Sequence, residues 1–270
     1  MSAAGKPALP GRWADLLPRI ASALVLVAVA GVEVWLGGIT FELFIAAICG
    51  AMIWELTRML APEARGAALQ LALLSAAAVF GASFLGPMTA LPILLAPAAV
   101  GGSMIAAQRR LFVLFCAWIT LAGYGFHLVR AGLGIDWMLW LIGVVVATDV
   151  AGYFAGKAIG GPKFWPRVSP KKTWSGTIAG WLAAAMVGLA FAIYSEGYTV
   201  LLILGSVLAA IFAQAGDIAE SALKRRMGVK DSSRLIPGHG GFMDRFDGMM
   251  GAAVFMLLAV LLVLVPAAGM

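Results

Sequence analysis

The chain has 270 residues, of which 62% are hydrophobic and 12% charged, and its formal net charge is +6. Soluble globular domains carry about 25% charged residues, so this composition excludes a soluble domain. The apolar content also excludes a disordered chain, and two cysteines are too few for a disulfide scaffold. A helical membrane protein remains, because long apolar runs without alternation are typical of transmembrane helices and not of β-barrels.

Nine apolar stretches of about 20 residues predict the fold, an all-α polytopic membrane bundle with about nine transmembrane helices. They lie at 20–37, 40–57, 67–86, 88–107, 111–129, 137–156, 175–194, 198–217 and 247–266. The sequence shows no repeat of fixed period and no low-complexity linker. We therefore expect one transmembrane catalytic domain over 1–270.

The lysines and arginines sort to one side of the predicted membrane. That side receives Lys6, Arg12, Arg19, Arg58, Arg65, Arg109, Arg110, Lys157, Lys163, Arg167, Lys171, Lys172, Lys224, Arg225, Arg226, Lys230, Arg234 and Arg245. The other side receives Arg130 alone. Because cytoplasmic loops carry the excess of Lys and Arg, we expect a cytoplasmic N-terminus and an outside C-terminus. Reading the first span as a cleaved signal peptide would invert these assignments, and we reject it.

The cysteines and the positive charge have simple explanations. Cys49 and Cys116 fall within predicted spans and are expected to be small apolar packing residues. The basic residues border membrane spans, so they indicate contact with anionic headgroups and anionic substrates and not with nucleic acid. Without a long polar N-terminal extension, we expect a bacterial plasma (inner) membrane.

Two connections on the cytoplasmic side, 157–174 and 218–246, are long and combine cations with acids. Long loops in a compact domain are usually functional or disordered, and the apolar anchors here indicate folded loops. We expect these two loops to form the site. Asp149 lies inside the sixth span, where a carboxylate needs a cavity, a cation or a partner. Two interpretations of Asp149 stay open: a buried hydrogen bond to a neighbouring helix, or a place in the site.

The residues after the eighth span are predicted to continue its helix. Asp217, Glu220, Ser221, Lys224 and Arg225 have the spacing i, i+3, i+4, i+7 and i+8, which puts them on one helix face. Snorkelling cations at a helix end would explain Lys224 and Arg225. This interpretation would leave Asp217 unexplained, so we favour a functional site.

A glycine-rich turn, 237–241, precedes the last span. Its glycines, Gly240 and Gly241 among them, allow backbone N–H groups to approach a phosphate closely. Asp244 and Asp247 follow, three residues apart at a predicted helix start. Mg²⁺ is typically held by one or two carboxylates together with substrate phosphates, so this combination with Asp217 predicts Mg²⁺–phosphate chemistry.

The segment 168–176 supplies a complement to these acids. Lys172 offers a point charge for phosphate, Ser169 and Thr173 offer hydroxyl groups, and the following helix offers its positive N-terminus. The spacing of a Walker A loop is absent. Thr173 or Ser175 can equally be a helix N-cap, and capping and phosphate binding can coexist.

Residues 221–247, SALKRRMGVKDSSRLIPGHGGFMDRFD, resemble the signature of the phosphatidate cytidylyltransferase (CDP-diacylglycerol synthase) family. The upstream SPKKTWSG (169–176) and DVAGYFAGKAIG (149–160) are similar to two further elements of that family. Gly152 stands where Ala is more common in the family. The resemblance covers about 149–247, and the first four spans agree only in character.

The resemblance implies an enzyme, a nucleotidyltransferase of phospholipid biosynthesis, with CTP and phosphatidate as substrates and CDP-diacylglycerol and pyrophosphate as products. It implies a Mg²⁺ ion held by acids that match Asp217 and Asp244, and it leaves a nearby monovalent cation open. Lys224, Arg225 and Arg245 are further candidate catalytic residues. The expected substrate-binding residues are Asp149, Ser169, Lys172, Thr173, Lys230, His239, Gly240, Gly241 and Asp247. The oligomeric state stays open, a homodimer included.

Three other functions are weighed against this one. A CTP-dependent lipid kinase would release CDP instead of pyrophosphate. A transporter with Asp149 and Asp217 as an ion relay would place its acids at mid-membrane in symmetric broken helices, and not in two cytoplasmic loops. A CDP-alcohol phosphotransferase would need a D-G-x-x-A-R motif, but Asp247-Gly248 continues as Met249-Met250-Gly251.

Overall fold

The computed structural model describes residues 16–195 and 199–267, and side chains within 20–194 and 199–262. Lys6 and Arg12, which support the expected orientation, lie outside the described residues. The described chain forms nine long α-helices, a short π-helical segment and one β-hairpin. The helices are α1 (Leu16–Leu36), α2 (Gly38–Leu60), α3 (Arg65–Ala82), α4 (Pro87–Met104), α5 (Arg109–His127), α6 (Ile135–Ala158), α7 (Trp174–Ser195), α8 (Thr199–Arg226) and α9 (Met243–Ala267).

The helices confirm the predicted membrane bundle. Within the described ranges, eight of them, α2 to α9, are long and apolar enough to cross a bilayer. The apolar part of α1, Ile20–Leu36, is shorter than these eight. Each predicted span corresponds to one helix, because uninterrupted apolar runs of this length satisfy every backbone group internally only as helices.

The connections differ from the sequence prediction in two places. The stretch expected as a loop at 157–174 contains an antiparallel hairpin of β1 (Lys163–Trp165) and β2 (Ser169–Thr173), in which Lys163 pairs with Thr173 and Trp165 with Ser169. The second connection is shorter than 218–246. Helix α8 runs on to Arg226, as its charged stripe predicted, and α9 begins at Met243.

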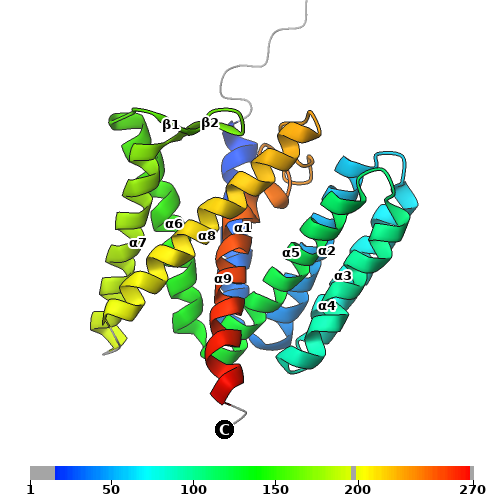
Figure 1. Ribbon diagram of the computed structural model, residues 1–270, viewed down its shortest axis with the longest axis horizontal. Coiled ribbons are helices and arrows are strands. Elements are labelled where there is room, and N and C mark those ends of the chain that lie inside the picture. The colour runs from blue at the N-terminus through cyan, green and yellow to red at the C-terminus, as the bar shows by residue number, and fades with distance from the viewer. Residues whose placement is uncertain (1–15, 196–198, 268–270) are drawn as a thin grey trace, which may run out of the picture.

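Figure 1 shows α3 and α4 on one side of the bundle, α6 and α7 on the other, and α9 between them. The hairpin, the start of α1, the end of α8 and the α2–α3 and α4–α5 connections lie at one end, and the C-terminal end of α9 lies at the opposite end. Every described connection with several cations is therefore at one end. Arg130 lies at the other end, where its guanidinium donates hydrogen bonds to the Val34 and Trp35 carbonyls that close α1 (2.7 and 3.1 Å).

The core lies where α2, α5 and α9 meet, and Phe41, Ile53, Phe112 and Met250 are buried in it. Cys49 and Cys116 are free and buried, which confirms them as packing residues. Small residues let the site-forming helices pack closely. A Cβ at Gly176 of α7 would stand 2.5 Å from the Gly152 carbonyl oxygen of α6, so only glycine fits this contact.

Candidate active site

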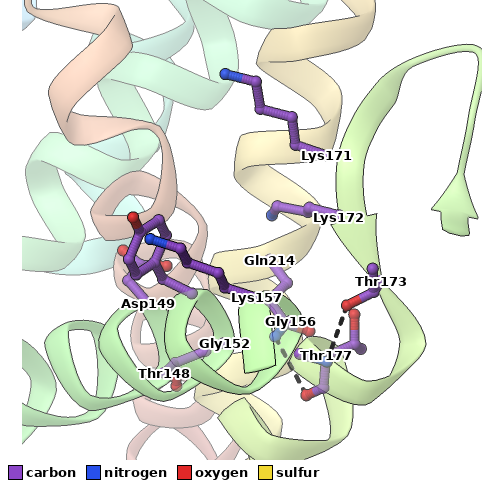
Figure 2. A pocket seen from close by; sticks show the side chains of 12 residues that line it. Thr148, Asp149, Gly152, Gly156, Lys157, Lys171, Lys172, Thr173, Thr177 and Gln214 are labelled. Carbon is purple, nitrogen blue, oxygen red and sulfur yellow. Dashed lines mark hydrogen bonds between the residues drawn. The ribbon is translucent and has the colours of Figure 1, made fainter. Parts of the chain in front are cut away.

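A cavity of about 330 Å³, with charged and hydroxyl-bearing side chains in its wall, opens between α6, β2, α7 and α8. Three of the residues expected to bind substrate line it: Asp149, Lys172 and Thr173. Lys157 and Lys171 line it too, and Figure 2 shows Lys171 and Lys172 extending from β2 toward the same side as Lys157. We call this space, with its three lysines, the lysine cavity. Its charge suits an anion with several phosphate groups.

One ion pair joins the lysine cavity to α8. Lys172 Nζ lies 2.5 Å from Asp217 Oδ2, and the two side chains are 26% and 31% exposed. Ser221, one turn further along α8, donates a hydrogen bond from Oγ to Asp217 Oδ1 (3.2 Å). Asp149 and Asp247 both lie within electrostatic reach of Asp217. Asp149, Asp217 and Asp247 therefore lie close together, and Lys172 acts on the first two of these acids. Asp149 also lines the lysine cavity.

A backbone contact between α8 and α9 explains why Asp247 lies close to Asp217. Gly216 packs against the Asp247 carbonyl oxygen so tightly that a Cβ at position 216 would overlap with it. This contact brings α8 and α9 together at the level of the two acids. Asp247 Oδ1 accepts a hydrogen bond from the Gly248 N–H (2.8 Å), at the start of α9.

Asp244 lies in a more closed setting. Its Oδ1 is 2.6 Å from Lys224 Nζ, which also lies 2.7 Å from Glu220 Oε2. Its Oδ2 accepts three hydrogen bonds, from Ser232 N (2.9 Å), Ser232 Oγ (2.8 Å) and Gly241 N (2.8 Å). The side chains of Lys224, Asp244 and Glu220 are 13%, 4% and 1% exposed. Asp244 therefore organises the loop that leads into α9.

Glu55 of α2, which the sequence analysis did not single out, holds the same loop from the other side. Its carboxylate is fully buried and accepts hydrogen bonds from Ser233 Oγ (2.6 Å), Met243 N (2.8 Å), Phe242 N (2.9 Å) and Ser232 Oγ (3.2 Å). The Met243 and Phe242 bonds satisfy N–H groups at the start of α9. An acid inside the apolar second span was the available signal, the same signal that drew attention to Asp149.

The glycine-rich turn is used differently from the expectation. Gly238 and Gly240 adopt positive φ (74° and 84°), as a tight turn requires. The N–H of Gly241, however, donates to Asp244, and the next N–H, that of Phe242, donates to Glu55. These two N–H groups are therefore engaged by carboxylates and are not directed toward a phosphate.

The remaining expected residues take three kinds of position. His239 contacts α1 through its Nδ1, 2.9 Å from Ser22 Oγ, and its carbonyl accepts a hydrogen bond from Arg245 Nε (3.0 Å). Thr173 caps α7, because its Oγ1 accepts a hydrogen bond from Gly176 N (3.2 Å), and this confirms the N-cap interpretation. Ser169 starts β2 outside the lysine cavity, and Arg225 and Lys230 are exposed.

The two acids expected to bind a metal fit that role unequally. Asp217 is accessible and has one ion pair, whereas both oxygens of Asp244 are engaged. In the described part of the chain, no three His, Cys, Asp or Glu side chains form a ready metal site. Mg²⁺ commonly uses one or two carboxylates and takes its other ligands from substrate phosphates and water. Asp217 therefore fits a Mg²⁺ ion that arrives with a nucleotide, and Asp244 fits once Lys224 leaves its Oδ1.

Comparison with known proteins agrees with this chemistry. A model of the cytidylyltransferase family matches residues 17–263. A phosphatidate cytidylyltransferase of Brucella suis is 37% identical over 261 residues, which is 90% of this chain and 93% of the relative. One from Staphylococcus aureus is 39% identical over 143 residues, 52% of this chain and 54% of the relative. The chain therefore belongs to the cytidylyltransferase family and is a nucleotidyltransferase.

Proposed function

We propose that the protein transfers the CMP moiety of CTP to phosphatidate, giving CDP-diacylglycerol and pyrophosphate for phospholipid biosynthesis. The observation that carries the proposal is the accessible ion pair between Asp217 and Lys172, because Lys172 lines the lysine cavity together with Lys157 and Lys171. The relatives from Brucella suis and Staphylococcus aureus are phosphatidate cytidylyltransferases, which supports the choice of substrates.

In the proposed reaction an oxygen of the lipid phosphate attacks the α-phosphorus of CTP. The new P–O bond forms as the bond from the α-phosphorus to the bridging oxygen breaks, and pyrophosphate leaves with that electron pair. The nucleophile is already ionised near pH 7 and needs no strong base. The difficulty is the approach of two polyanions, which Lys157, Lys171 and Lys172 would offset as point charges around the triphosphate.

Asp217 and Asp244 are the proposed ligands of Mg²⁺, with Asp217 the more accessible of the two. When bound, the ion would neutralise phosphate charge and stabilise the departing pyrophosphate. When the nucleotide enters, Lys172 would leave its ion pair with Asp217 and bind a phosphate oxygen of the nucleotide instead. The carboxylate of Asp217 would then be free to bind Mg²⁺. Whether a monovalent cation joins Mg²⁺ does not alter these assignments.

The site is proposed to face the cytoplasm from a bacterial plasma membrane, with the N-terminus inside and the C-terminus outside. The gathering of cation-bearing connections at one end of the bundle supports this orientation. The segments 157–174 and 218–246 belong to one catalytic domain. CTP enters from water, while the lipid tails stay in the bilayer.

The test is incubation of the purified protein with radiolabelled CTP, Mg²⁺ and phosphatidate in detergent micelles. With the label in the cytidine ring, we expect it in the lipid fraction, together with one pyrophosphate per lipid formed. Label that stays in water as CDP, with γ-phosphate transferred to lipid, would instead identify a CTP-dependent lipid kinase. No transfer of either label to lipid would refute the proposal.

A further inference from the structure

A second cavity, of about 420 Å³, lies between α1, α2, α6 and α9 and is separate from the lysine cavity. Its walls are apolar side chains, such as Leu26 and Val34 of α1, Ile45 of α2 and Met138 of α6. Arg245 of α9 is the one charged residue on the described lining. The volume falls within the range of about 300–1,000 Å³ that is typical of ligand sites. Apolar walls of this kind favour contact with hydrocarbon over contact with water.

Arg245 connects this cavity to the proposed reaction centre. It follows Asp244 in the chain, and its Nε donates a hydrogen bond to the His239 carbonyl (3.0 Å). The side chain is exposed, so its other N–H groups can reach a ligand. A guanidinium group is a planar donor that suits a phosphate. The cavity therefore combines one phosphate-binding cation with a long apolar wall.

Helix α6 contributes residues to the walls of both cavities. Val146 lines the apolar cavity and Asp149 lines the lysine cavity. Three residues apart, they are neighbours on one face of α6, about 4.5 Å apart along its axis. A ligand in the apolar cavity with its polar head at the cytoplasmic end would thus bring that head close to a nucleotide in the lysine cavity.

Helix α1 forms the wall of the apolar cavity toward the bilayer. Val27 and Trp35 line the cavity and are nevertheless 69% and 74% exposed, so the space is open to the surroundings of the bundle along α1. At its cytoplasmic end α1 is attached to the turn before α9, where Ser22 Oγ donates to the Pro237 carbonyl (2.9 Å). A lipid chain can therefore enter beside α1 while its headgroup meets that turn.

We propose that the apolar cavity binds one acyl chain of the phosphatidate substrate and that Arg245 binds its phosphate. This inference rests on the proposed function and adds the lipid subsite to it. It assigns the cations to different substrates: Arg245 to the lipid phosphate, and Lys157, Lys171 and Lys172 to the nucleotide. It also gives α1 a direct role in substrate binding, although α1 lies outside the segment 149–247 that carries the sequence motifs.

The first experiment fills the cavity. Gly31 of α1 lines the cavity, and a Cβ there would meet no atom within 4 Å. Gly31→Phe should lower kcat/KM for dioleoyl phosphatidate at least 10-fold relative to dihexanoyl phosphatidate, whose short chains leave room for the ring. The matched control is Gly205→Phe on α8. A Cβ at Gly205 also meets no atom within 4 Å, and Gly205 lines neither the lysine cavity nor the apolar cavity.

An unchanged ratio of the two lipids in Gly31→Phe would overturn the inference, and so would an equal change in Gly205→Phe. If Gly31→Phe does not yield folded protein, Gly31→Leu gives the same comparison with a smaller side chain. Failure of the proposed function looks different, because the unaltered protein would then use neither lipid.

The second experiment tests which of the two substrates Arg245 binds, by comparing the KM for phosphatidate with the KM for CTP. Arg245→Gln should raise the KM for phosphatidate at least 10-fold at both chain lengths and leave the KM for CTP within 2-fold. Lys172→Ala should do the reverse. A rise in the KM for CTP in Arg245→Gln, with the lipid KM unchanged, would overturn the assignment of Arg245 to the lipid.

Discussion

The two lysine–aspartate pairs of the site have the same chemistry and opposite surroundings. Lys172 and Asp217 are 26% and 31% exposed, and Lys172 lines the lysine cavity. Lys224 and Asp244 are 13% and 4% exposed, and three further donors satisfy Asp244 Oδ2. An accessible pair can open when a charged substrate arrives, whereas a buried pair costs several kcal/mol to break. We therefore expect the first pair to open toward the substrate, and the second to fix the shape of the loop before α9 in addition to the role of Asp244 as a proposed Mg²⁺ ligand.

The largest effect is expected at Asp244. Asp244→Asn leaves Lys224 without one of its two anions and turns an amide NH₂ group toward N–H and O–H donors. Removing one partner of a buried pair typically costs about 3–5 kcal/mol. We expect loss of turnover together with loss of unfolding free energy, measured by pyrophosphate release and by thermal unfolding in detergent.

A variant Asp244→Asn that keeps the stability of the unaltered protein would show that the Asp244 loop tolerates an amide. The buried Lys224–Asp244 pair would then not be needed for the stability of that loop. Near-normal pyrophosphate release would contradict the proposed metal ligand as well.

Asp217→Asn should separate activity from stability. The Lys172–Asp217 pair is accessible, and pairs of this kind contribute about 0–1 kcal/mol, so the melting temperature should barely change. Loss of a group that stabilises charge in the transition state typically costs about 10²–10³ in kcat. The measurement is Mg²⁺-dependent pyrophosphate release beside thermal unfolding. Turnover within a few-fold of the unaltered protein would remove Asp217 from the catalytic centre.

Glu55→Gln tests whether the hydrogen bonds of Glu55 hold the loop that contains Ser232 and leads to Asp244 in place. The amide keeps one acceptor oxygen but turns NH₂ toward donors such as Met243 N, at a typical cost of about 1–3 kcal/mol. We expect a lower unfolding free energy and a kcat about 10-fold lower, since the Asp244 loop shifts, with little change in the KM for CTP.

The matched control for Glu55→Gln is Glu42→Gln, the same change on the same helix. Glu42 lies 2.8 Å from His127 Nδ1, away from both loops of the site. This variant should keep its kcat. Equal loss of kcat in both variants would show that any carboxylate of α2 matters in the same way, and would remove the special role of Glu55.

The sequence predicts the helices well because each span is an apolar run with no competing structure. The helical extension of α8 was equally predictable, since the i, i+4 spacing of Asp217 and Ser221 has meaning only on a helix. The hairpin was not predictable, because its strands have three and five residues and β2 contains Pro170. An acid inside the second span makes Glu55 unusual, but its role could not be predicted, because its partners lie 177 to 188 residues away in the chain.

Lys172→Ala tests the accessible pair from its other member. Loss of a point charge on the triphosphate should raise the KM for CTP about 10-fold, which corresponds to about 1.4 kcal/mol of binding. The kcat at saturating CTP should change less. Lys163→Ala is the control, because Lys163 lies in β1 of the same hairpin and outside the lysine cavity. A KM for CTP that is the same in both variants would remove Lys172 from the nucleotide site.

Lys157 and Lys171 should give the smallest effects. Among the described residues, neither lysine forms an ion pair with an aspartate, but Lys157 Nζ lies 5.8 Å from the centre of the Tyr153 ring at the edge of the lysine cavity. Exposed charges act over about 8–10 Å and are screened by salt. Lys157→Ala and Lys171→Ala should each raise the KM for CTP about 2- to 5-fold at low salt, with smaller ratios at 0.5 M KCl. A ratio independent of salt would mean that these lysines contact the nucleotide directly, as Lys172 is proposed to do, and the cavity would then bind the triphosphate through all three.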